Sequence, residues 1–247
     1  MNKIKVGAVS YLNTKPLLYG IESSAELLDQ IELTKDYPSK IASQILDGSI
    51  DIGLVPVAVI PKMNKYFIVS DVCIGADGDV ASVCLFSDVE LKLVEKILLD
   101  YQSETSSALC RILMKHYWKK DIPTENMQEN SGTRIEGTTA GVLIGDRALQ
   151  QRQISKYIYD LAGHWKQATG LPFVFAAWIA NKKLPEDFLQ LFNRKTGEGV
   201  NDIGAVLKRT QCSYYDLSKY YTQNISYRLD AEKIKGMNLF LSLMQQL

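Results

Sequence analysis

The residues best suited to chemistry lie in the segment that follows the first apolar run of the sequence. Residues 10–15 read Ser-Tyr-Leu-Asn-Thr-Lys and place hydroxyl, amide and amine groups in one short loop. A second polar segment carries Ser103, Thr105 and Ser106 at the start of a predicted helix, where free N–H groups bind anions. Neutral donors of this kind predict a site for a small organic anion.

Further candidates stand where other apolar runs begin or end. In open parallel sheets, ligands bind beyond the carboxyl ends of the strands, so such positions meet at one edge. With Asn13 as the candidate catalytic residue, the candidate binding residues are Ser10, Tyr11, Pro56, Gly75, Ser82, Ser103, Thr105, Ser106, Gly145 and Asp146.

Single candidates also have ordinary structural explanations. A hydroxyl of segment 103–106 can cap a helix, and Asn13 can shape a turn. Asp146 is more typical of a helix N-cap, and Tyr11 can belong to the core. The convergence of several polar loops on one sheet edge favours the functional interpretation.

Several other chemistries lack their motifs. The sequence has no G-x-G-x-x-G or G-x-x-x-x-G-K-[ST] for nucleotides and no G-x-S-x-G of a serine hydrolase. The four cysteines are Cys73, Cys84, Cys110 and Cys212. They show no C-x-x-C spacing, and neither histidine is adjacent to a cysteine in the sequence, which argues against a zinc site. We expect reduced, mostly buried thiols, and neither a metal nor an organic cofactor.

The composition excludes further classes. The 28 Lys and Arg residues balance 28 Asp and Glu residues in a chain of 247, whereas nucleic-acid and membrane-surface binders carry a basic surplus. No uncharged run reaches the ~18 residues of a membrane span. The apolar run 4–9 is short and contains Lys5, unlike a secretion signal. We expect a cytoplasmic protein without nucleic-acid or membrane partners; the composition leaves the oligomeric state open.

Alternating strands and helices must position these groups. Predicted strands cover 4–9, 31–36, 52–55, 66–71, 81–87, 96–100, 141–144 and 173–180. Predicted helices cover 38–47, 106–119, 185–194, 199–211, 213–223 and 231–246. Strand–helix–strand units predict α/β lobes, each a mostly parallel sheet flanked by helices.

We expect two such lobes with a ligand cleft between them. The first lobe is predicted to comprise 1–84 and 177–247, and the second 85–176. The chain would cross between lobes near 75–86 and 172–180, and the C-terminal helices would return to the first lobe.

A series of sequence blocks, in a fixed order, resembles a known family. The blocks are 9–17 (Val-Ser-Tyr-Leu-Asn-Thr-Lys-Pro-Leu), 51–57, 82–87, 103–107 with Arg111, 143–146, and Trp165 with 169–176 (Thr-Gly-Leu-Pro-Phe-Val-Phe-Ala). They resemble the chorismate dehydratase family of the futalosine route to menaquinone. The resemblance covers most of the chain and implies the two-lobed type II periplasmic-binding-protein fold. The chain departs from the pattern at Asp79, where Pro is expected, and at Ala58 and His164, where acidic residues are common.

The resemblance implies a reaction without a cofactor, in which chorismate loses water and yields 3-[(1-carboxyvinyl)oxy]benzoate. Asn13 would lie at the reacting carbons. Thr105 and Ser106 would bind one carboxylate of this dicarboxylate, and Ser82 with amides near Gly75 the other. An amide is a poor base, so the substrate's own carboxylate or a water would take the proton.

Three other functions fit the same fold. A solute-binding protein would be exported, whereas this sequence runs from Met1 directly into a predicted strand. The ligand-sensing half of a transcription regulator would need a DNA-binding helix pair. The sister enzyme dihydroxynaphthoate synthase uses a His base, and neither His116 nor His164 follows a predicted strand.

Overall fold

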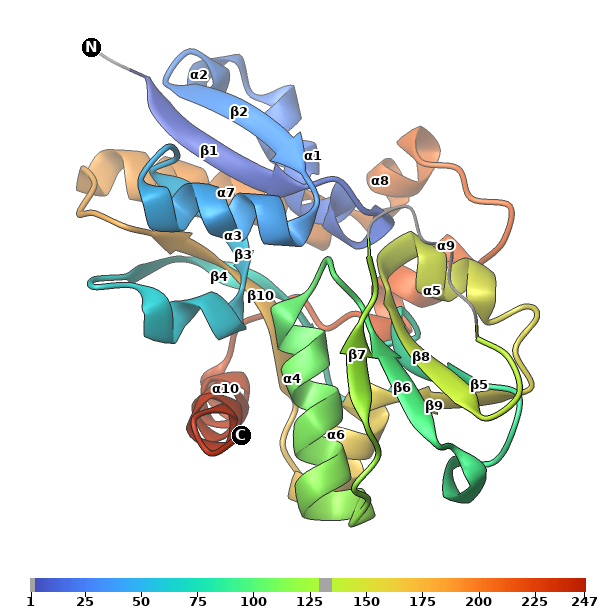
Figure 1. The fold of residues 1–247 in the computed structure, drawn as a ribbon. Helices are drawn as coiled ribbons and strands as arrows, with labels where there is room; N and C mark the ends of the chain where they lie inside the picture. Colours follow the sequence, from blue (N-terminus) through green and yellow to red (C-terminus); the bar gives the residue numbers. More distant parts are fainter. Residues whose placement is uncertain (1–2, 129–134) are drawn as a thin grey trace.

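Two five-stranded sheets organise the computed structural model, which describes residues 3–128 and 135–247 (Figure 1). The first sheet has the order β2 (Ile31–Asp36), β1 (Ile4–Val9), β3 (Ile52–Pro56), β10 (Phe173–Ala180) and β4 (Phe67–Ala76). The second has the order β7 (Thr124–Asn126), β6 (Lys96–Leu99), β8 (Thr139–Ile144), β5 (Val83–Ser87) and β9 (Tyr157–Asp160).

Each sheet is mixed, with one strand running against the others. In the first sheet, β10 is antiparallel to both β3 and β4, while β1 is parallel to β2 and β3. In the second sheet, β5 is antiparallel to β8 and β9, while β6 is parallel to β7 and β8. The α/β class is confirmed, and the antiparallel strands are those that the chain enters just after it changes sheets.

The division into two lobes stays a proposal, and strand pairing moves its limits. The predicted first lobe includes Val83 and Cys84, but these residues pair with β8 of the second sheet. The predicted second lobe includes residues 173–176, but these pair with β3 and β4 of the first sheet. Strand hydrogen bonds extend beyond the points at which the sequence changes character, so the crossings lie within 77–82 and 161–172.

The helices surround both sheets (Figure 1). They are α1 (Lys15–Ser23), α2 (Ala25–Leu28), α3 (Pro38–Asp47), α4 (Glu104–Ile112), α5 (Gly145–Gln151), α6 (Leu161–Thr169), α7 (Glu186–Asn201), α8 (Ile203–Arg209), α9 (Leu217–Lys219) and α10 (Ala231–Met244). Short 3-10 turns cover Leu12–Thr14 and Val57–Lys62, and π-helical turns cover Leu113–Trp118 and Tyr220–Asn224. None of the helices in the described part of the chain has both the length and the apolar character of a membrane span.

One predicted helix is confirmed at both ends and another boundary is wrong. Helix α3 begins at Pro38 and ends before Gly48, which adopts a φ of 78°. The predicted break between 194 and 199 does not occur, because α7 runs through both of its glycines. A Cβ at Gly199 would lie 2.3 Å from the Pro16 carbonyl oxygen of α1, so this glycine serves close helix packing.

The C-terminal helices cover the first sheet. Helix α7 packs on α1 and β4, and α10 packs on β10. The predicted helix over 213–223 is largely replaced by the short α9 and a π-helical turn. This segment instead carries buried aromatic side chains to the junction between the sheets.

The thiols provide a test of the packing. Cys73, Cys84 and Cys110 are buried and Cys212 is half-buried, and all four are free, as expected. Burial raises the pKa of Cys73 and of Cys110 to about 12, and that of Cys84 well above its usual value. At pH 8 we expect a chromogenic disulfide reagent to modify Cys212 alone in the native chain and the other thiols only in denaturant. Rapid native modification of a second thiol would contradict this packing.

Candidate functional site

A cavity lies between the two sheets, at the ends of their strands. Most of the predicted site residues line it, namely Tyr11, Asn13, Pro56, Ser82, Ser103, Ser106 and Gly145. The same cavity is lined by apolar side chains from both sheets, among them Leu54, Ile144 and Phe175. No Lys or Arg is among its lining residues, so the described cavity offers neutral donors to a ligand.

Two buried polar groups on this cavity lack hydrogen-bond partners. They are the side-chain oxygen of Asn13 and the hydroxyl of Ser82, for which the described residues supply no partner. Ser82 is fully buried, and 9% of Asn13 is exposed. Burying an unpaired polar group costs roughly 1–3 kcal/mol, so two of them facing one cavity indicate a ligand that completes their hydrogen bonds.

The loop that carries Asn13 is held from several sides. The Thr14 hydroxyl donates to the Val9 carbonyl at 2.7 Å, and the Leu12 N–H donates to Oδ1 of Asp146 at 3.0 Å. The hydroxyl of Tyr227 donates to the Asn13 carbonyl at 2.9 Å. These contacts fix the backbone of the 3-10 turn, and the Asn13 side chain remains available to a ligand.

The start of α4 combines a structural and a binding role. Ser103 is the N-cap, and its hydroxyl accepts from the Ser106 N–H at 3.2 Å. The two hydroxyls lie 2.9 Å apart, and both residues line the cavity. The capping explanation therefore holds for Ser103. The same geometry presents a pair of hydroxyls at the positive end of a helix dipole.

Two predicted residues, Ser10 and Gly75, do not line the cavity. Ser10 is exposed, and its N–H donates to the Asp36 carbonyl at 3.2 Å. Gly75 lies within β4, where an added Cβ would be 2.8 Å from the Phe173 carbonyl oxygen. The glycine thus permits close strand packing. Its neighbour Ile74 lines the cavity, and binding by amides beside Gly75 stays a prediction.

Two further predicted residues connect the sheets instead of lining the cavity. Oγ1 of Thr105 accepts from the Ala58 N–H at 3.1 Å, since residue 105 lies about 100° around the helix from Ser106. The N-cap of α5 is Ile144, so the N-cap prediction for Asp146 is wrong. The Asp146 carboxylate accepts from Leu12 across the junction, and burial raises its pKa.

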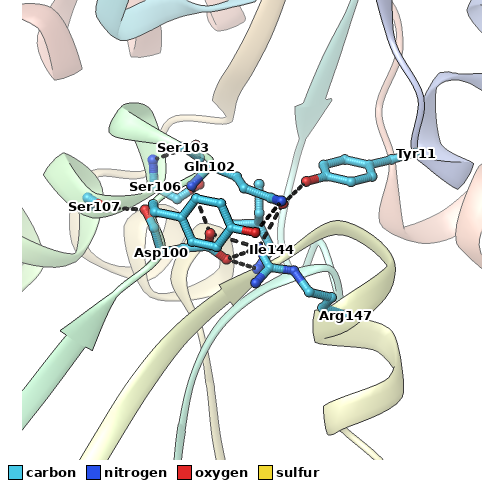
Figure 2. A network of polar contacts seen from close by, with 9 residues as sticks. Tyr11, Asp100, Gln102, Ser103, Ser106, Ser107, Ile144 and Arg147 are labelled. Atoms are coloured by element: carbon cyan, nitrogen blue, oxygen red, sulfur yellow. Dashed lines mark hydrogen bonds and ion pairs between the residues drawn. The ribbon is translucent and has the colours of Figure 1, made fainter. Parts of the chain in front are cut away.

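A buried ion pair, absent from the sequence predictions, stands beside the cavity (Figure 2). The Asp100 side chain is fully buried, and both of its oxygens lie 2.8 Å from Nη2 of Arg147. The carboxylate also accepts from the N–H groups of Gln102 at 2.9 Å and Ile144 at 3.1 Å. Burial raises the pKa of Asp100, and Arg147 and these N–H groups lower it.

This ion pair extends to the first sheet through Gln102 (Figure 2). Arg147 donates to Oε1 of Gln102 at 2.7 Å, and the Tyr11 hydroxyl donates to the same oxygen. Burial raises the pKa of Tyr11 above its usual value, which keeps its hydroxyl a neutral donor. Asp100 ends a predicted strand, and Arg147 follows Gly145 at the end of another. The sequence pattern therefore placed both residues at strand ends, but nothing in it indicated that they pair.

Neither histidine lines the cavity. His164 is half-buried, and its Nδ1 accepts from Nε1 of Trp118 at 3.4 Å. Nε2 of His116 is buried without a partner among the described residues. Across 3–128 and 135–247, no group of three or more His, Cys, Asp and Glu side chains is placed to hold a metal ion.

Comparisons with known proteins match this chain to one family and to relatives that share one name. A family model described as menaquinone biosynthesis matches residues 4–246. The chain is 24% identical to the chorismate dehydratase of Thermus thermophilus over 97% of this chain and 94% of that protein. It is 31% identical to the chorismate dehydratase of Campylobacter jejuni over 74% of this chain and 66% of that protein.

The fold has counterparts among solved structures. A Candida albicans protein described as exhibiting the generic periplasmic binding protein fold superposes with a TM-score of 0.70 at 12% identity. The match covers all of this chain and 91% of the Candida protein. At this identity the likeness shows the fold alone, and it confirms the predicted periplasmic-binding-protein-like architecture.

Proposed function

Because the chain belongs to the menaquinone biosynthesis family, we propose that it is a chorismate dehydratase of the futalosine route. In this role it is a hydro-lyase that converts chorismate to 3-[(1-carboxyvinyl)oxy]benzoate and water. The observation that carries the proposal is the pair of unpartnered polar groups, on Asn13 and Ser82, that face one cavity. The proposal includes a cytoplasmic location and a small dicarboxylate as the partner.

The cavity suits a dianion in spite of its lack of lining cations. The hydroxyls of Ser103 and Ser106 stand at the start of α4, and Pro38 brings the start of α3 to the same cavity. Helix starts carry partial positive charge and donate N–H groups to anions. We assign one substrate carboxylate to Ser103 and Ser106, and the other to Ser82.

The chemistry requires positioning more than a strong protein base. The C–H bond at the ring carbon bearing the enolpyruvyl ether breaks, and its electron pair becomes a ring double bond. The C–O bond of the neighbouring hydroxyl breaks, and the leaving oxygen takes up a proton to give water. Asn13 orients the hydroxyl or the proton transfer, because an amide is a poor base. The substrate's own carboxylate or a water accepts the proton.

A turnover assay tests the proposal. We expect the purified protein to convert chorismate to a product lighter by one water, with the absorption of a benzoate. Chorismate that binds without reacting would instead indicate a solute-binding protein. Conversion of the cyclic futalosine intermediate would indicate the sister enzyme dihydroxynaphthoate synthase. Well-folded protein that gives no product from chorismate would overturn the proposal.

A further inference from the structure

A buried tyrosine, Tyr227, stands behind the loop that carries Asn13. Only 4% of this residue is exposed. The Tyr227 carbonyl accepts from the Cys73 N–H at 2.7 Å, which ties this segment to β4. Tyr227 lies between the helices predicted over 213–223 and 231–246 and belongs to neither of them.

Tyr227 makes a hydrogen bond to the backbone of Asn13, the residue whose side-chain oxygen lacks a partner. Its hydroxyl donates to the Asn13 carbonyl at 2.9 Å, in a fully buried environment. Burial raises the pKa of Tyr227 well above its usual value, so the hydroxyl keeps its proton and remains a donor. The contact fixes the Asn13 backbone, and thereby the position of an amide that is itself free to meet the ligand.

We propose that Tyr227 is a positioning residue for the dehydration proposed above. Its hydroxyl holds the Asn13 carbonyl and thereby fixes the Asn13 side chain at the reacting carbons. The inference rests on the proposed function and extends it to a residue that does not line the cavity.

A phenylalanine substitution tests this role, since it removes one oxygen atom and keeps the ring. We expect Tyr227→Phe to lower kcat by about 3- to 10-fold with little change in KM, because it removes one buried hydrogen bond that positions Asn13.

Tyr215→Phe is the matched control from the same part of the chain. The Tyr215 hydroxyl donates to Oδ1 of Asn224 at 3.0 Å, away from the cavity-lining residues. We expect this variant to lose some thermal stability and to keep kcat and KM. If Tyr227→Phe behaves in the same way as this control, the positioning role is wrong while the proposed function stands. If the unmodified protein does not turn over chorismate, the proposed function fails and this inference fails with it.

Discussion

We expect an Asn13→Ala variant to lose chorismate turnover by at least about 100-fold while its stability changes by less than about 1 kcal/mol. The side-chain oxygen of Asn13 has no hydrogen-bond partner among the described residues, so its removal breaks no internal bond. The backbone position is held independently by the hydroxyl of Tyr227. Steady-state kinetics and thermal unfolding of the same preparation provide the two measurements.

Asn181→Ala is the control for this prediction. Nδ2 of Asn181 donates to the carbonyls of Ile50 at 2.9 Å and Ile45 at 3.3 Å, away from the cavity. We expect this variant to lose roughly 1–3 kcal/mol of stability and to keep its turnover. Turnover that persists in Asn13→Ala would leave Asn13 with a turn-forming role only.

The second large effect is expected from the ion pair beside the cavity. Arg147→Ala should lower the free energy of unfolding by about 3–5 kcal/mol at pH 7, because it leaves the fully buried Asp100 carboxylate without its cation. Asp100→Ala should cost less, since the Arg147 side chain is 34% exposed and can turn to water. Denaturant unfolding of both variants measures the difference.

The destabilisation by Arg147→Ala is expected to depend on pH. Burial already raises the pKa of Asp100 in the folded chain, and the loss of Arg147 removes a group that lowers it. The folded variant therefore holds the proton at a higher pH than the unfolded chain does. We expect the destabilisation of Arg147→Ala to be largest at neutral pH and to shrink as the pH falls through the folded pKa of Asp100.

An exposed ion pair is the matched control. Lys62 and Glu104 lie 2.6 Å apart with side chains 50% and 53% exposed. Lys62→Ala should cost at most about 1 kcal/mol, since exposed pairs contribute little. Equal losses in Lys62→Ala and Arg147→Ala, or a loss independent of pH, would show that burial of Asp100 does not govern the stability of this region.

The sequence predicts helix boundaries correctly where the conformational preference of a single residue sets them. Pro38 and Gly48 mark the two ends of α3 because Pro suits the first turn of a helix and Gly the left-handed position after it. The same rule fails in α7, because the sequence does not reveal that Gly199 faces the Pro16 carbonyl of α1. Glycine usually weakens a helix, but Gly199 instead allows α1 to approach α7 closely.

The order of polar and apolar residues was enough to identify the segments that carry the candidate site, because parallel strands and their helices place polar loops at one edge of a sheet. Which side chains face the cavity depends on the packed fold: Ser103 and Ser106 do, whereas Thr105 turns to Ala58. The packed fold also decided that Asp100 pairs with Arg147, far apart in sequence. Rotation about a helix and the meeting of distant charges depend on how whole elements pack, and no local pattern of residues encodes that placement.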